Sequence, residues 1–469
     1  MATLKQQWFG NMRGDILAGI VVGLALIPEA LAFAFIVGVD PRVALYASFT
    51  IAVIISFVGG RPALISAATG AMALVLVSLM ANHGLQYMLA ATILTGIIQV
   101  ILGLLGVAHL MRFIPNSVML GFVNALGIMI FMTQMPYLIG FNMLTYVFAI
   151  VTLILVYVIP RFIKTIPSPL IAIVVMTAIA LVSGVKLQTI GDIGTMPRTL
   201  PTFFIPNIPL SFETLKIIFP YALALSIVGL LESLLTSQVL DDMTDTDSNK
   251  NKEARGQGIA NFINGFFGGM AGCALIGQSV INVKSGGRGR LSTFTAGVFL
   301  MFLIIVLGDF VIKVPMPVLV GVMIMVSMTT FNWGSFKFMK QAPLSETLVM
   351  VITIAIILYT QNLAIGVVLG VILSALIFVS KISRLAVKRE SHYFTVKGPL
   401  FFASTTTFIE AFNDVSDQRI VIDFSDSHLW DESAIGAIIK VKNQLESNGV
   451  DVKIVGLNDS SKKLYEQLT

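Results

Sequence analysis

Apolar segments long enough to cross a lipid bilayer follow one another through most of this 469-residue chain, from Ile16 to about Val379. A helix that spans the hydrocarbon core needs roughly twenty predominantly apolar residues. Only 12% of the residues are charged and 56% are hydrophobic, whereas soluble domains carry roughly 25% charged residues. The pattern argues against a soluble fold and predicts a polytopic α-helical membrane protein.

Fourteen helical segments are predicted from the apolar runs and from the Gly, Pro and Asn residues between them. The first seven lie at about 14–38, 42–58, 67–81, 87–107, 116–135, 143–159 and 168–183. Seven more follow at about 213–239, 255–271, 276–285, 291–311, 316–331, 344–360 and 362–380. Equal halves with odd numbers of segments can enter the membrane from opposite faces, which predicts inverted repeats over about 13–183 and 211–382.

The loop charges predict the orientation of this membrane domain. Most Lys and Arg residues, Arg61, Lys250 and Arg288 among them, fall on one side, and few, such as Lys186 and Lys313, fall on the other. Basic loops stay in the cytoplasm, so we expect a multi-pass plasma-membrane protein with both termini cytoplasmic. The first apolar segment runs directly into further spans, which predicts a retained helix rather than a cleaved signal peptide.

Charged residues return after Lys381, and the character of the chain changes. Short β-like and helix-like segments then alternate, at Tyr393–Val396, Ile420–Phe424, Ser433–Ser447 and Val452–Gly456. This order predicts a small α/β domain over 386–469, after a membrane domain over 1–385.

Two of the predicted membrane segments are poor helices, and they occupy equivalent places, third and tenth in order. Each is preceded by a Gly-Gly pair, at Gly59-Gly60 and Gly268-Gly269, and each then carries Ala-Leu-Ile. Short, glycine-interrupted segments in corresponding places point to a transporter site, because a helix that begins at mid-membrane exposes unpaired backbone N–H groups. Such helix starts attract anions.

Small and polar residues follow at both of these places. In the first half, Thr69 lies where a half-helix would begin, and Gly70 and Ala71 are small enough for close ligand approach. The matching place in the second half is occupied by Ile276, Gly277 and Gln278. The hydroxyl of Thr69 also suits a helix cap, and that role is compatible with contact to the substrate.

Two carboxylates lie inside apolar helices, where a charged group is costly. Glu29 follows Pro28 in the first segment, and Glu232 lies in the first segment of the second half. Either could serve the transported ions or form a structural bond to a neighbouring helix. Thr236, one turn beyond Glu232, could help it bind a proton or Na⁺, or bond back to its own helix backbone.

Other reactive groups give little indication of chemistry. Cys273 is interpreted as a small buried residue, and neither it nor the four dispersed His residues shows metal-ligand spacing. An acidic loop contains Asp241, Asp242, Asp245 and Asp247. We interpret it as a solvated turn rather than a metal site. With no nucleophile–base pair, phosphate loop or basic footprint, we expect neither an enzyme nor a nucleic-acid-binding protein.

Taken together, four stretches of the sequence resemble the SulP anion transporters with a C-terminal STAS domain. They are Gly14–Ala34, Gly59–Met72, Val283–Leu291 and Ile422–Ala437. The resemblance covers essentially the whole chain. It implies a seven-plus-seven inverted repeat like that of uracil permeases, a core domain that moves against a gate domain by alternating access, and homodimers.

The resemblance also implies the roles of individual residues. An anion would bind between Thr69, Gly70 and Ala71 on one side and Leu275, Ile276 and Gly277 on the other. Glu232 and Thr236 match positions that serve coupling ions. Ser433 matches a regulatory serine that is phosphorylated in stand-alone STAS proteins. The sequence around it departs from their pattern, which favours the alternative of a plain surface serine beside acidic residues.

Two departures from the family concern the site itself. Gln278 stands where many members have Arg, so a strong positive charge is missing and helix starts with Gln278 would hold the anion. Sodium-coupled relatives tend to have Asp and Thr where this chain has Glu232 and Ile276, which favours proton coupling.

The leading hypothesis is a secondary active transporter of a small anion such as sulfate, bicarbonate or a dicarboxylate, coupled to H⁺ or Na⁺ and without a cofactor. Two alternatives remain: a transporter of a neutral solute such as a nucleobase, and a membrane scaffold that recruits cytoplasmic partners through its STAS domain.

Overall fold

A computed structural model describes residues 3–138, 142–163, 166–192, 196, 198–415 and 417–468, apart from the side chains of 110–112. The chain divides into two compact units, Met1–Gly370 and Val371–Thr469, with the division inside the last long apolar helix. The predicted domain limits at 385 and 386 stay predictions.

The first unit is helical. Its helices are α1 Leu4–Phe9, α2 Met12–Val37, α3 Pro41–Val58, α4 Gly70–Leu104, α5 Asn116–Gln134, α6 Met143–Val158, α7 Ser168–Ser183, α8 Phe212–Thr244, α9 Lys250–Phe266, α10 Ile276–Lys284, α11 Arg290–Val311, α12 Met316–Thr330, α13 Ser335–Gln341 and α14 Leu344–Thr360. Helix α15, Leu363–Ile382, contains the division between the two units. Within the described residues, nine helical stretches are long and apolar enough to cross a membrane, which confirms the polytopic helical fold.

The predicted segments at 67–81 and 87–107 correspond to the two helical parts of α4, which are separated by a kink at the non-helical Gly84. Two predicted starts were wrong. The first part of α4 begins at Gly70 rather than 67. Helix α9 begins at Lys250 rather than 255, because the Asn249 side chain caps it. The grouping of the segments into two inverted repeats of seven stays a prediction.

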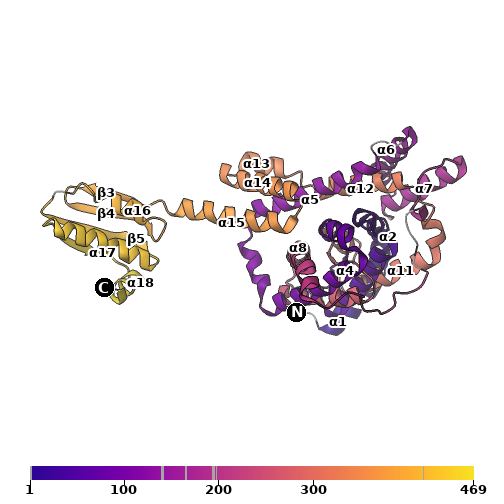
Figure 1. Cartoon of the computed structure of the whole chain (residues 1–469), viewed down its shortest axis with the longest axis horizontal. Coiled ribbons are helices and arrows are strands. Elements are labelled where there is room, and N and C mark those ends of the chain that lie inside the picture. Colours follow the sequence, from indigo (N-terminus) through magenta and orange to yellow (C-terminus); the bar gives the residue numbers. More distant parts are fainter. Residues whose placement is uncertain are drawn as a thin grey trace. The chain divides into compact units, whose positions relative to one another are not determined.

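The helices of this unit pack in two groups. The first, here called the core group, consists of α2, α3, α4, α8, α9, α10 and α11, and Figure 1 shows α2, α4, α8 and α11 gathered together. The second, the gate group, consists of α5, α6, α7, α12 and α14. The groups meet where α2 contacts α7 and α12 and where α4 contacts α5.

A buried ionic cluster fixes the end of α8 to the chain that precedes α4. Arg61 Nε lies 2.9 Å from Asp241 Oδ1, and Lys250 Nζ lies 2.6 Å from Asp241 Oδ2. Glu253 on α9, fully buried, accepts hydrogen bonds from the Gly60 and Arg61 amides. The interpretation of Asp241 as part of a solvated turn was therefore wrong, because α8 continues to Thr244; Asp242, Asp245 and Asp247 are exposed as expected.

Asp241→Asn is expected to lower the free energy of unfolding by about 2–3 kcal/mol, because it leaves the buried Arg61 guanidinium without its counter-ion. Denaturant unfolding of purified protein measures the effect. Asp242→Asn, at the exposed neighbouring position, is the matched control. Equal stability of the two variants would contradict a structural role for the cluster.

The second unit contains a four-stranded sheet of order β3-β4-β5-β6. Its strands are β3 Ala386–Glu390, β4 Tyr393–Leu400, β5 Arg419–Leu429 and β6 Asp451–Val455, and its helices are α16 Thr405–Glu410, α17 Glu432–Ser447 and α18 Asp459–Leu468. Strands β4, β5 and β6 are parallel, with β3 antiparallel at the edge.

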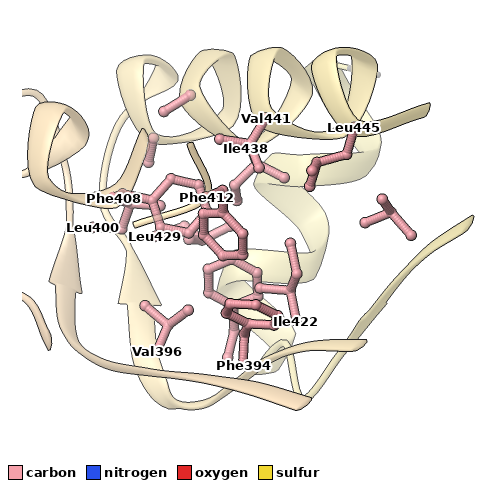
Figure 2. Packing of buried hydrophobic residues seen from close by; sticks show 14 of the residues in the cluster. Phe394, Val396, Leu400, Phe408, Phe412, Ile422, Leu429, Ile438, Val441 and Leu445 are labelled. Carbon is pink, nitrogen blue, oxygen red and sulfur yellow. The ribbon is translucent and has the colours of Figure 1, made fainter. Parts of the chain in front are cut away.

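Apolar side chains from the sheet and from α16 and α17 form the core of this unit. Phe394 and Ile422 from the strands pack with Phe408, Ile438 and Val441 from the helices (Figure 2). The alternating segments predicted here are confirmed, whereas β3, α16 and α18 were not predicted.

Candidate functional site

Two three-residue strands, one from each half of the membrane unit, pair with each other inside the core group. Strand β1 is Ser66–Ala68 and β2 is Gly272–Ala274; they run antiparallel, with Ala67 opposite Cys273. All their residues are buried. A Cβ on Gly272 would lie 2.1 Å from the Ala67 carbonyl oxygen, so only glycine permits this approach. The pairing gives the backbone N–H and C=O groups of these extended, buried segments hydrogen-bond partners where water is scarce.

Each strand leads directly into a helix start. Helix α4 begins at Gly70 after β1, and α10 begins at Ile276 after β2. The first amides of an α-helix have no acceptor inside the helix and carry partial positive charge. The antiparallel β1–β2 pair therefore links the two helix starts that the sequence singled out, with one start at each end of the pair.

At the first helix start, Thr69 is the N-cap, and its fully buried side chain accepts a hydrogen bond from the Met72 amide at 3.4 Å. This geometry supports the capping role. A Cβ on Gly70 would lie 3.0 Å from Phe33 on α2 and 3.1 Å from Ile130 on α5. Gly70 therefore lies where the core group meets the gate group, and Ala71, fully buried, follows it.

At the second helix start, the Leu275 amide donates to the Ile65 carbonyl at 2.9 Å, and Ile276 is half-buried. Gly277 is exposed, and a Cβ built on it would meet no atom within 4 Å. The buried Gln278 amide donates to the Glu29 carboxylate of α2. Open space thus lies beside Gly277 in the first turn of α10, next to the residue that forms the Glu29–Gln278 pair.

A chain of hydrogen bonds joins Glu232 on α8 to the first helix start. The Cys273 thiol donates to Glu232 Oε2 at 3.0 Å, and Cys273 Sγ lies 3.1 Å from Thr69 Oγ1. Glu232 is only 8% exposed, and no Lys or Arg in the described part of the chain forms a salt bridge with it. The carboxylate is thus held by polar contacts without a protein counter-ion.

Thr236 and Cys273 are placed differently from their predicted roles. The Thr236 hydroxyl donates to the Glu232 backbone carbonyl at 2.7 Å, which is the backbone-bonded alternative rather than a contact to the carboxylate. Cys273, interpreted as a small buried residue, is buried but also bonds both Thr69 and Glu232. Its place in the second Gly-rich segment was the only sequence signal for this position.

The remaining predicted residue, Ser433, lies in the second unit. It is exposed in the first turn of α17, next to the N-cap Asp431, which accepts hydrogen bonds from the Ala434 and Phe402 amides. In the ranges that the structure describes, no group of three His, Cys, Asp or Glu side chains is arranged to hold a metal ion.

Comparisons with known proteins match both units. The profile of the sulfate permease family matches residues 12–145 and 141–353, and that of the STAS domain matches residues 384–469. A Bacillus subtilis protein named "Putative sulfate transporter YbaR" is 57% identical over 99% of both chains.

Two solved structures share the fold. The transmembrane domain of a cyanobacterial bicarbonate transporter, BicA, aligns with a TM-score of 0.67 and 25% identity, covering 78% of this chain and 98% of its own. The murine Slc26a9 anion transporter aligns with a TM-score of 0.85 and 18% identity, covering 98% of this chain and 88% of its own.

Proposed function

Because the chain belongs to the sulfate permease family and carries a STAS domain, we propose that it is a secondary active transporter of a small anion. The substrate class is sulfate, bicarbonate or a dicarboxylate. Relatives named as sulfate and bicarbonate transporters support this range. The proposal contains no enzymatic step and no cofactor beyond the coupling ion.

The observation that carries the proposal is the pairing of β1 with β2. It sets the starts of α4 and α10 at the two ends of one short strand pair, and open space lies beside Gly277 at the second start. Two helix starts in a water-poor site offer several amide donors and partial positive charge to one anion.

Glu232 is the proposed coupling-ion site, with H⁺ or Na⁺ as the ion. A buried carboxylate without a counter-ion is more stable when it binds a proton or a cation. Because Cys273 forms hydrogen bonds with both Glu232 and Thr69, an ion bound at Glu232 would lie next to the proposed anion site. A bound cation beside the anion also offsets its charge.

Alternating access would come from movement of the core group against the gate group. Gly70 lies at their contact, close to Phe33 and Ile130, so such movement changes the exposure of the first helix start.

We further propose that the protein lies in the plasma membrane, in contact with membrane lipid, with both termini cytoplasmic. We propose that it is a homodimer. Its STAS domain would act through a cytoplasmic partner or through phosphorylation at Ser433.

One observation favours a second substrate class. Gln278 is engaged with Glu29, and no Arg or Lys lies among the residues of the two helix starts. An amide–carboxylate pair offers both donors and acceptors, which suits a neutral solute such as a nucleobase.

Uptake into proteoliposomes distinguishes these functions. Radiolabelled sulfate, bicarbonate, a dicarboxylate and uracil would be compared with and without an imposed pH or Na⁺ gradient. We expect one of the anions to accumulate and the gradient to accelerate it. Accumulation of uracil alone would establish the second function, and no uptake of any solute above empty liposomes would contradict both.

A further inference from the structure

A cavity of about 740 Å³ lies between the two helix groups. Helices α4 and α8 of the core group and α5 and α14 of the gate group line it. Its polar lining includes Ser78, His83, Thr133, Lys216, Tyr221 and Asn362.

The charge on the lining of this cavity is positive. Lys216 is its charged residue, and no Asp or Glu is among the described residues that line it. The ammonium lies 4.9 Å from the centroid of the Phe212 ring on the same helix. No carboxylate forms a salt bridge with it in the described part of the chain, so its positive charge is free to act on the cavity.

The cavity opens at one end of the membrane unit. Lys216 lies in the second turn of α8, whereas Arg61 bonds Thr244 in the last turn of the same helix. A helix of 33 residues is about 50 Å long, so the basic ionic cluster and Lys216 lie near opposite membrane faces. In the proposed orientation the basic cluster lies at the cytoplasmic face, so the cavity lies toward the outer face.

The inner end of the cavity approaches the candidate site. Leu74 and Val75 in its lining follow Gly70 by about one turn of α4. On α5, Met129 lines the cavity next to Ile130, whose side chain is close to Gly70. The inner end of the cavity therefore lies about one turn of α4 from the first helix start.

We propose that this cavity is an anion-capture vestibule, in which Lys216 attracts a small external anion before it reaches the helix starts. The inference rests on the proposed function for its substrate. A fixed charge in a cleft with low-dielectric walls raises the local concentration of counter-ions, and salt weakens the effect. Lys216 is thus a positioning residue for the approach of the anion.

A kinetic experiment tests this role. In right-side-out vesicles at low ionic strength, Lys216→Gln raises the KM for the anion about fivefold with little change in maximal rate, and added inert salt reduces the difference. Lys216→Arg retains the wild-type KM. Lys313→Gln is the matched control, because Lys313 is exposed at the same face and does not line the cavity. An unchanged KM in Lys216→Gln overturns the proposal.

A labelling experiment tests the vestibule independently of transport. Met132 lines the cavity and is 50% exposed, whereas the single native cysteine, Cys273, is fully buried. The Met132→Cys thiol should react faster with an anionic than with a cationic methanethiosulfonate reagent, and adding Lys216→Gln should lower this ratio about fivefold.

The two experiments separate the possible failures. An unchanged labelling ratio overturns the vestibule even if the protein transports anions. A ratio that responds to Lys216 while no anion is transported supports the vestibule and contradicts the proposed function. Normal size-exclusion behaviour of each variant shows that it is folded.

Discussion

Replacing Gly277 with leucine should reduce anion uptake by about 100-fold or more while leaving the stability of the protein unchanged, since displacement of a ligand from its productive position has effects of this size. Gly277 is exposed in the first turn of α10, and a Cβ there meets no atom within 4 Å. The leucine side chain would extend from the first turn of α10 into this open space. Uptake and thermal unfolding of the same preparation measure the two effects.

Gly436→Leu is the matched control for this substitution. Gly436 is likewise exposed on a helix, α17, and its Cβ position is equally open, but it lies in the STAS domain. We expect it to transport at the wild-type rate, and Gly277→Ala to show an intermediate loss. Wild-type uptake by Gly277→Leu would show that substrate does not pass in front of α10.

Glu232→Gln is expected to abolish the response of uptake to an imposed pH or Na⁺ gradient, so that the ratio of rates with and without the gradient falls to about one. The neutral amide takes up no proton near neutral pH and lacks the negative charge that would hold Na⁺. Glutamine keeps the size of the side chain and can still accept from the Cys273 thiol. Uptake should therefore persist in an uncoupled form. Parallel measurements in proteoliposomes with each gradient identify which ion is involved.

Glu213→Gln provides the control within the same helix, because Glu213 is an exposed carboxylate in the first turn of α8. Its uptake should remain gradient-driven. If Glu232→Gln retained full coupling, the coupling ion would bind elsewhere, and Glu29 would be the next carboxylate to replace.

The sequence was most informative where one physical requirement dominates. Long apolar runs predict spanning helices, because backbone groups in a bilayer must bond within their own segment. Gly-Gly pairs before Ala63 and Ala274 predicted the interrupted segments, and β1 and β2 lie within them. The α/β order of the tail was equally clear, because its core strands alternate buried and exposed residues.

Features that depend on distant partners were not predictable. Strands of three residues are too short to show a period of two. Cys273 bonds Glu232, 41 residues away in sequence, and nothing local distinguishes it from a small buried residue. Glu253 and Lys250 look like loop residues until the amides of Gly60 and Arg61 and the carboxylate of Asp241 provide their partners.

The pairing of β1 with β2 also constrains how the protein is made. Thr69 and Cys273 are 204 residues apart, so Ser66–Ala68 is synthesised long before the strand that completes it. At about 5–20 residues per second, the first strand waits on the order of 10–40 s with its backbone groups unmatched. A nascent chain that stops short of Gly272 therefore lacks the strand that pairs with Ser66–Ala68, and the first helix start reaches its final surroundings only after the second half of the chain is made.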